Sequence, residues 1–281
     1  MGIYFIADFD PHAIAASGQC FRMQTVSPNR VEAMMRNQYT AITSLGSDLY
    51  EFSCSDADYQ HIWRPYFDLD TDYGAFHRAV DENDPYLLHA AELSRGLRIL
   101  RQDPWEVLIS FILSQRKSIP AIQDAIEKLC GCFGSTVTSQ GRSFSSFPSP
   151  QALADVPEEA LRACSVGYRA PYIKAAAQAA AKGELDLAGF SRLTDEELTK
   201  QLLAIYGVGI KVANCVSLFG YHRLAAAPVD VWIQRVIDDQ YGGISPFGRY
   251  PGFAGIMQQF MFYERMVNKK SPTRPKKAKT A

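Results

Sequence analysis

The sequence lacks a long apolar run free of charged residues. No such run reaches the about 20 residues that a membrane-spanning helix needs. The first residues also lack the basic start, apolar stretch and cleavage site of a secretory signal. We therefore expect an intracellular protein without membrane contact, located in the cytoplasm or nucleoid of a bacterium or in the nucleus of a eukaryote.

Clustered cysteines are missing as well. The six cysteines are scattered, and no two have the two-residue spacing of a zinc site. No four-cysteine group lies near the C-terminus, where an iron–sulfur cluster would need one. We expect reduced thiols, no metal, no iron–sulfur cluster and no other cofactor.

A strong excess of one charge is also absent. The 29 basic and 30 acidic residues give a net charge of −1, which excludes a histone-type nucleic-acid protein but allows one local basic face. Six basic residues and no acidic residue lie within residues 267–281. We expect residues 266–281 to form a basic disordered tail, which is either a solvated solubility tail or a phosphate tether.

What is present indicates a two-part α+β chain. Residues 1–95 carry strand signals such as the alternating Tyr50, Phe52 and Cys54, and predict a small antiparallel β domain with a linking helix. The period becomes helical from about Asp72. Residues 96–265 predict an all-helical body that contains a helix–hairpin–helix motif.

Helix starts in this body are clear. Asp103, followed by a proline and then Glu106, is typical of an N-cap, and Thr194 with Glu197 predicts a capping box. Residues 133–150 are rich in Ser, Gly, Phe and Pro, and we expect them to form a loop.

The hairpin is predicted at residues 207–209, where Gly207 and Gly209 bracket one valine. Gly207 can adopt a positive φ, and Gly209 lets the backbone approach a large ligand. The first amides of the following helix have no partner within the helix and would suit a DNA phosphate. An ordinary helical hairpin is the alternative.

Lys211 lies in the first turn of that second helix. The helix dipole and a desolvated pocket would both favour the free amine, which a nucleophilic lysine requires. Asp230 follows nineteen residues later, just before an apolar periodic run. It is either an N-cap or a carboxylate facing the pocket of the lysine.

The segments GVGIKVANC and PVDVW resemble the helix–hairpin–helix glycosylase superfamily with its Gly/Pro–Asp loop, and within it the 8-oxoguanine DNA glycosylases. The similarity extends over SGQCFR (17–22), YFDLD (66–70), RILRQDPWEVLISFILS (98–114), VGYRAPY (166–172) and FAGIMQQFMF (253–262).

This resemblance implies a bifunctional glycosylase and AP lyase that acts on double-stranded DNA containing oxidised guanine. It implies that Lys211 attacks C1′ of the damaged nucleotide, expels the base and forms a Schiff base, after which β-elimination cuts the strand. Asp230 would stabilise the cationic sugar. We expect a monomer without an obligate partner.

The resemblance also implies a pocket for a flipped base. Cys215 and Phe262 would sandwich the base, and Gln258 would bond its Watson–Crick edge. The carbonyl of Gly18 would accept from N7–H, a donor that 8-oxoguanine has and guanine lacks. Taken alone, Cys215, Gln258 and Phe262 would each favour core packing, whereas the three together in the family's positions favour the pocket. For Gly18, the alternative is a simple turn.

The resemblance also implies residues that fill the gap which the flipped base leaves in the DNA stack. Tyr168 matches a wedge, Arg169 an arginine that reads the orphaned cytosine, and Arg116 stands where familiar eukaryotic members have asparagine. A second cytosine-reading arginine falls on Ala121, and a phosphate-binding histidine on Trp232. These departures predict a weaker preference for cytosine opposite the lesion.

Four other interpretations stay open. A monofunctional alkylbase glycosylase lacks the lysine, and endonuclease III-like enzymes usually carry the missing iron–sulfur cysteines. A non-catalytic helix–hairpin–helix DNA-binding module would leave the pairing of Lys211 with Asp230 unexplained. A glycosylase for other damaged purines is the remaining alternative.

Overall fold

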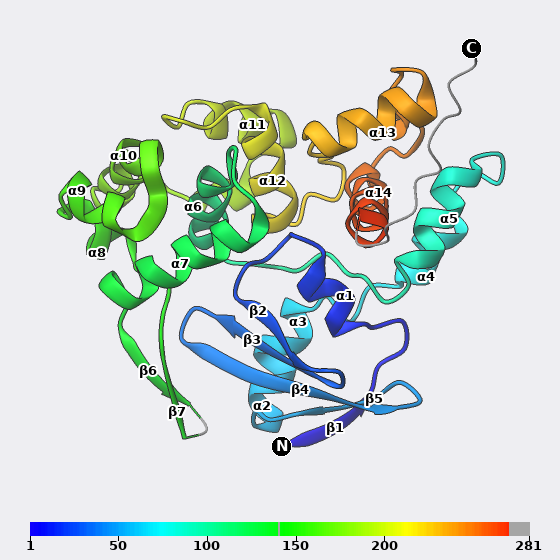
Figure 1. Cartoon of the computed structure of the whole chain (residues 1–281), viewed down its shortest axis with the longest axis horizontal. Coiled ribbons are helices and arrows are strands. Elements are labelled where there is room, and N and C mark those ends of the chain that lie inside the picture. Colours follow the sequence, from blue (N-terminus) through cyan, green and yellow to red (C-terminus); the bar gives the residue numbers. More distant parts are fainter. Residues whose placement is uncertain (140, 270–281) are drawn as a thin grey trace, which may run out of the picture.

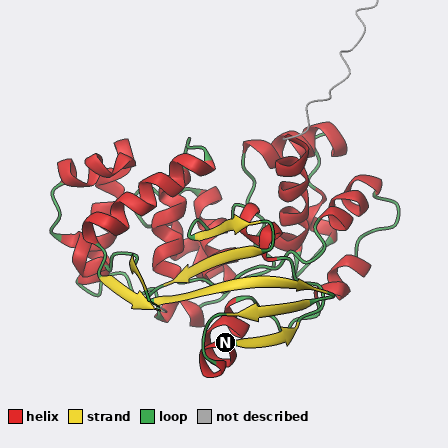
Figure 2. Cartoon of the chain, turned by 60° about the horizontal axis from the view of Figure 1, so that its bottom comes forward, coloured by secondary structure: helices red, strands yellow, loops and turns green. Residues whose placement is uncertain are grey.

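A computed structural model describes residues 1–139 and 141–269 (Figure 1). Its N-terminal part is built on a five-stranded antiparallel sheet in the order β1-β5-β4-β3-β2. Figure 2 shows the strands side by side along one edge of the molecule, with most helices stacked above them. The strands are β1 (Gly2–Phe5), β2 (Met23–Ser27), β3 (Arg30–Met35), β4 (Gln38–Gly46) and β5 (Leu49–Phe52).

The alternation expected in β5 is confirmed. Tyr50 and Phe52 are buried, whereas Leu49 is exposed, so side chains alternate between core and solvent as a half-buried strand requires. Ser47 and Asp48 both have positive φ angles and close the predicted turn before β5.

Helical structure begins earlier than the sequence predicts. The first helix packs beside the sheet, and a run of short helices starts sixteen residues before Asp72, at Asp56. The helices of this part are α1 (Pro11–Ala16), α2 (Asp56–Asp58), the π-helical turn η1 (Tyr59–Trp63), α3 (Arg64–Tyr66), α4 (Tyr73–Arg78) and α5 (Pro85–Leu93).

The body that follows is mainly helical. Its helices are α6 (Pro104–Ser114), α7 (Ile119–Phe133), α8 (Pro150–Ala154), α9 (Glu158–Leu161), α10 (Ala170–Ala181), α11 (Asp195–Leu203), α12 (Ile210–Gly220), α13 (Val231–Tyr241) and α14 (Ala254–Lys269). Both predicted starts are confirmed, because Asp103 caps α6 and Thr194 forms a complete capping box with Glu197. Helices α6 and α12 pack against each other near the centre (Figure 1).

The prediction of a loop at residues 133–150 is wrong in part. Residues in it form a hairpin of β6 (Thr136–Ser139) and β7 (Arg142–Ser145). The hairpin leans on the main sheet, where Arg142 binds Glu32 and donates to the Tyr39 hydroxyl at 3.0 Å. These contacts with residues about a hundred positions away explain why a Ser-rich segment is extended.

The final boundary also differs from the prediction. Helix α14 continues through Lys269, four residues past the expected end of the helical body. The rest of the predicted tail, residues 270–281, lies outside the described residues. Across the described ranges, no helix combines the length and apolarity needed to cross a membrane.

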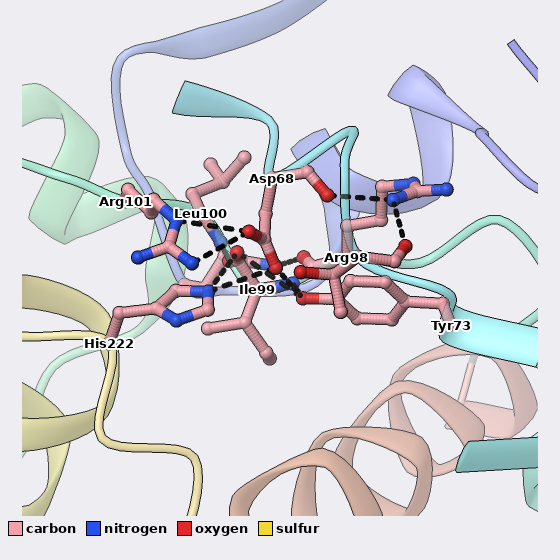
Figure 3. Close-up of polar contacts among 9 residues, drawn as sticks. Asp68, Tyr73, Arg98, Ile99, Leu100, Arg101 and His222 are labelled. Carbon is pink, nitrogen blue, oxygen red and sulfur yellow. Dashed lines mark hydrogen bonds and ion pairs between the residues drawn. The ribbon is translucent and has the colours of Figure 1, made fainter. Parts of the chain in front are cut away.

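A buried polar cluster, which we call the Asp68 cluster, joins the two parts of the chain (Figure 3). The Asp68 carboxylate is paired with the Arg101 guanidinium at 2.9 Å and with His222 Nε2 at 3.2 Å, and accepts from the Tyr73 hydroxyl at 3.1 Å. Arg98 donates to the Asp68 backbone carbonyl at 2.8 Å. Because His222 follows α12, the cluster anchors that helix to the segments around the sheet.

Candidate active site

A cavity of about 310 Å³ lies where α6, α12, α14 and the loop after α1 meet. The structure brings six of the predicted site residues together in its wall: Gly18, Lys211, Cys215, Asp230, Gln258 and Phe262. They come from four separate segments of the chain, one of them in the N-terminal part, so the complete fold is needed to assemble them.

Lys211 enters the cavity from the first turn of α12. Its Nζ donates to Ser114 Oγ at 3.2 Å and lies 5.0 Å from the centre of the Phe111 ring. The Ser114 hydroxyl in turn donates to the Phe111 carbonyl at 2.8 Å. Because the Ser114 hydroxyl uses its proton in the bond to Phe111, its oxygen accepts the hydrogen bond from Lys211. Sequence reasoning missed Ser114 and Phe111, because nothing local marks contacts between helices about a hundred residues apart.

Asp230 fulfils both interpretations that the sequence left open. Its Oδ1 caps α13 by accepting from the amides of Trp232 and Ile233, each at 2.9 Å. The same residue lines the cavity beside Lys211. The two amide bonds hold the carboxylate in place at a helix N-terminus, where a negative charge is favoured.

Cys215 and Phe262 occupy the walls expected of a base pocket. Cys215 is one turn after Lys211 and only 2% exposed. Burial raises the pKa of the Cys215 thiol to about 11, although the charge of Lys211 opposes the rise. The thiol is therefore neutral at physiological pH and offers an apolar, polarisable surface.

Gly18 lies close to the Phe262 ring. A Cβ atom there would lie 3.0 Å from Phe262 Cε1, and the φ of Gly18 is +72°. The contact is tighter than most Cβ contacts, and the positive φ favours glycine. The backbone of residue 18 thus forms part of the cavity wall directly.

The hairpin has the predicted geometry at Gly207. Its φ is +86°, and a Cβ atom there would lie 2.4 Å from the Tyr172 ring. Gln115, just after α6, donates to the Gly207 carbonyl at 3.0 Å and holds the turn against the body. Gly209 is the N-cap of α12 without a side-chain cap, and no atom lies near its Cβ direction.

A second loop lies across from this hairpin at η3 (Gly167–Arg169). Tyr168 is 48% exposed, whereas Arg169 is buried beneath it with the guanidinium 4.3 Å from the Tyr168 ring centre. Arg169 donates to the Val166 carbonyl at 3.1 Å, but its buried Nε has no partner in the described part of the chain.

Lys117 connects this loop to the cavity, and Arg116 precedes it in the chain. Arg116 is exposed and has a positive φ of 51°. Lys117, which sequence reasoning missed, lines the cavity and binds the Ser165 carbonyl. Burial and the nearby charge of Arg169 lower the pKa of Lys117. Of the predicted DNA-contacting residues, none lines the cavity itself: Gly207, Gly209, Arg116, Tyr168 and Arg169.

Two family models match adjoining parts of the chain. Residues 5–108 match the 8-oxoguanine DNA glycosylase N-terminal domain, and residues 109–245 match the HhH-GPD superfamily of base excision DNA repair proteins. The junction between them falls within α6.

Known proteins are similar over comparable stretches. A probable N-glycosylase/DNA lyase of Methanothermobacter thermautotrophicus is 34% identical over 63% of this chain and 62% of its own length. The N-glycosylase/DNA lyase of Saccharomyces cerevisiae is 37% identical over 54% of this chain and 44% of its own. The matched regions thus span less than two thirds of these curated relatives.

A solved structure covers nearly the whole fold. The 8-oxoguanine glycosylase/lyase of Clostridium acetobutylicum, in complex with double-stranded DNA, is 30% identical and superposes with a TM-score of 0.88 over 94% of this chain and 93% of that one. Sequence, fold and cavity agree, and the chain belongs to the 8-oxoguanine DNA glycosylase family of the helix–hairpin–helix glycosylase superfamily.

Proposed function

We propose that this protein is a bifunctional DNA glycosylase and AP lyase that removes 8-oxoguanine from duplex DNA. The observation that carries the proposal is the cavity in which Lys211 and Asp230 lie beside Cys215, Phe262 and Gly18. A DNA-binding module without catalysis needs neither a half-buried amine nor a fixed carboxylate beside an apolar slot.

The first step is displacement of the base. The lone pair of the Lys211 amine forms a bond to C1′ while the glycosidic bond breaks and its electrons leave with the base. Ser114 accepts an N–H bond from Lys211, so the lone pair of the free amine stays available for attack. The carboxylate of Asp230 stabilises the positive charge that develops on the sugar.

The second step is strand cleavage. Loss of a proton from nitrogen and opening of the sugar ring give an imine between Lys211 and C1′. The imine acidifies the proton at C2′, and its removal expels the 3′-phosphate by β-elimination. Hydrolysis of the imine then releases the lysine.

Base selection follows from the shape of the cavity. The base leaves the stack and inserts between Cys215 and Phe262, while the carbonyl of Gly18 accepts from N7–H of the lesion. Unmodified guanine has a lone pair at N7, which the oxygen of the Gly18 carbonyl would repel.

We assign binding of the duplex to two loops, the hairpin at residues 207–209 and the loop at η3. The uncapped N-terminus of α12 after Gly209 presents free amides to a phosphate. Tyr168 and Arg116 enter the gap that the base leaves, and the unpartnered Nε of Arg169 donates to the base opposite. The Clostridium relative was solved with cytosine opposite 8-oxoguanine, which supports this kind of duplex as the partner.

Preference for the opposite base is proposed to be weak. Ala121 cannot donate a hydrogen bond, and Trp232 stands where a histidine would bind phosphate. Rates of 8-oxoguanine excision measured opposite C, A, G and T should therefore differ by about tenfold or less, since one reader of the opposite base remains. A strong cytosine preference would contradict this part of the proposal.

The direct test is a duplex with a single 8-oxoguanine. We expect release of the free oxidised base and a nick at the lesion, with base release lost in Lys211→Gln. DNA binding without base release from this duplex would favour the non-catalytic module. Release of other damaged purines but not of 8-oxoguanine would favour a different substrate.

A further inference from the structure

Helix α14 carries two consecutive glutamines in the cavity wall. Gln258 and Gln259 both line the cavity and are both 3% exposed. Gln258 is the residue that the family pattern singles out, whereas Gln259 has no role in the function proposed above.

The two amides are bonded to each other. Gln259 Nε2 donates to Gln258 Oε1 at 3.3 Å. Gln259 Oε1 is buried and has no hydrogen-bond partner in the described part of the chain. A buried carbonyl oxygen is normally paired, because leaving it unpaired forfeits the bonds it makes with water. An unpaired oxygen on a residue that lines a ligand cavity therefore points to a donor on the ligand.

The bond between the amides also fixes what Gln258 can offer. Its oxygen is engaged by Gln259, so its Nε2 remains as a donor. Two neighbouring residues of the cavity wall therefore carry a donor on Gln258 and an unpaired acceptor on Gln259. Neither residue alone, with a freely rotating amide, would define this pattern.

With Gln258 facing position 6 of the base and Gln259 facing position 1, this pattern is complementary to a guanine-type edge and not to an adenine-type edge. A guanine-type base presents the acceptor O6 beside the donors N1–H and 2-amino, whereas an adenine-type base presents the donor 6-amino beside the acceptor N1. We propose that Gln259 is a further specificity-determining residue, which orients Gln258 and accepts from N1–H or the 2-amino group of the flipped base. This inference rests on the proposed function.

The pair supplies a selection that Gly18 cannot. Both 8-oxoguanine and 8-oxoadenine carry N7–H, so the carbonyl of Gly18 distinguishes oxidised from normal purines but not these two lesions. Gln258 and Gln259 distinguish guanine-type from adenine-type edges. Oxidation and base identity are thus read at opposite sides of the ring.

The test compares excision of 8-oxoguanine and 8-oxoadenine, each opposite cytosine, under single-turnover conditions. Gln259→Met keeps the length and removes both hydrogen bonds. We expect the rate on 8-oxoguanine to fall about tenfold, the value of one neutral hydrogen bond, while the rate on 8-oxoadenine stays the same or rises. Gln178→Met, on α10 outside the cavity, is the matched control and should change neither rate.

A binding experiment separates this inference from the proposed function. In the Lys211→Gln background, the ratio of dissociation constants for the 8-oxoguanine and 8-oxoadenine duplexes should shrink about tenfold when Gln259→Met is added. This result would support the inference even if wild-type protein released no base. An unchanged ratio, or an equal loss on both duplexes, would show that Gln259 only packs, and would overturn it.

Discussion

Two polar regions of this molecule are satisfied to very different degrees. In the Asp68 cluster, the buried carboxylate is bound by Arg101, His222 and Tyr73 at distances of 2.9 to 3.2 Å. In the cavity, Lys211 has one hydrogen bond at 3.2 Å to a side chain, and Gln259 keeps an unpaired oxygen. Helix α12 joins the two regions, with Lys211 in its first turn and His222 just past its end.

This difference in hydrogen bonding indicates that the Asp68 cluster stabilises the fold and that the cavity serves function. A buried polar group with all its partners fixes the fold, whereas one with partners missing is ready for a ligand. Substitutions in the Asp68 cluster should therefore lower the free energy of unfolding, and substitutions in the cavity should lower the rate of base release while the fold persists.

The largest expected effect is that of Asp68→Asn. Burial alone would raise the pKa of Asp68, but the hydrogen bonds and charges of His222 and Arg101 hold it well below its usual value. Asparagine replaces one acceptor oxygen of this buried carboxylate with a donor that faces the donors around it, and should cost about 3 kcal/mol of unfolding free energy, measured by urea denaturation at pH 7. Because the folded pKa is depressed, the difference from wild type should shrink as pH falls below about 4. An equal difference at pH 7 and pH 2.5 would contradict the assignment.

Asp230→Asn should produce the largest effect in the cavity. Asparagine still accepts the amide bonds that cap α13, so the melting temperature should change little. The charge that stabilises the sugar cation is lost, and we expect base release to slow by about 10²–10³-fold in single-turnover assays. Asp230→Ala, which removes cap and charge together, should lose both rate and stability. A normal rate in Asp230→Asn would reduce Asp230 to a helix cap.

Glu106 gives the opposite case to Asp68, a carboxyl in the first turn of α6. Burial raises the pKa of Glu106 to about 7, although the charge of Arg22 opposes the rise. Since the folded state then binds the proton more tightly, stability should fall as pH rises from about 4.5 to 7. Glu106→Gln should remove that loss and be more stable than wild type by about 3 kcal/mol at pH 8, with no difference at pH 4. A variant less stable at pH 8 would show that the carboxylate is paired.

Ser114→Ala should have the smallest effect. Without the acceptor on Oγ, Lys211 loses its positioning, and imine formation should slow about tenfold at unchanged DNA affinity. Ser110→Ala, one turn earlier on α6, is the matched control and should leave the rate unchanged. A shift in the pH–rate profile of Ser114→Ala, absent from Ser110→Ala, would tie the effect to the amine. Equal rates for both variants would remove Ser114 from the site.

Much of this architecture can be predicted from local sequence. Asp103 and Thr194 cap helices because their neighbours complete local hydrogen bonds, and Gly207 turns because glycine adopts a positive φ at little cost. The family motif further indicates which residues share a cavity, although their individual roles stay predictions.

Other features depend on contacts between distant segments. The contact of Lys211 with Ser114, the pairing of Asp68 with His222 and the strand of Arg142 against Glu32 each join residues about a hundred or more positions apart. Periodicity and capping describe single elements, so they carry no information on which elements meet. Gln259 was missed for a related reason, because a buried glutamine in a helix is indistinguishable by pattern from its neighbours.

The central claim is that one amine performs the chemistry. Borohydride reduction of the enzyme on a duplex with a single 8-oxoguanine, followed by mass spectrometry of the cross-linked peptide, tests it most directly. We predict that the sugar is attached to Lys211 and that Lys117, the other lysine lining the cavity, is unmodified. Attachment to Lys117, or base release with no trapped adduct, would contradict the account.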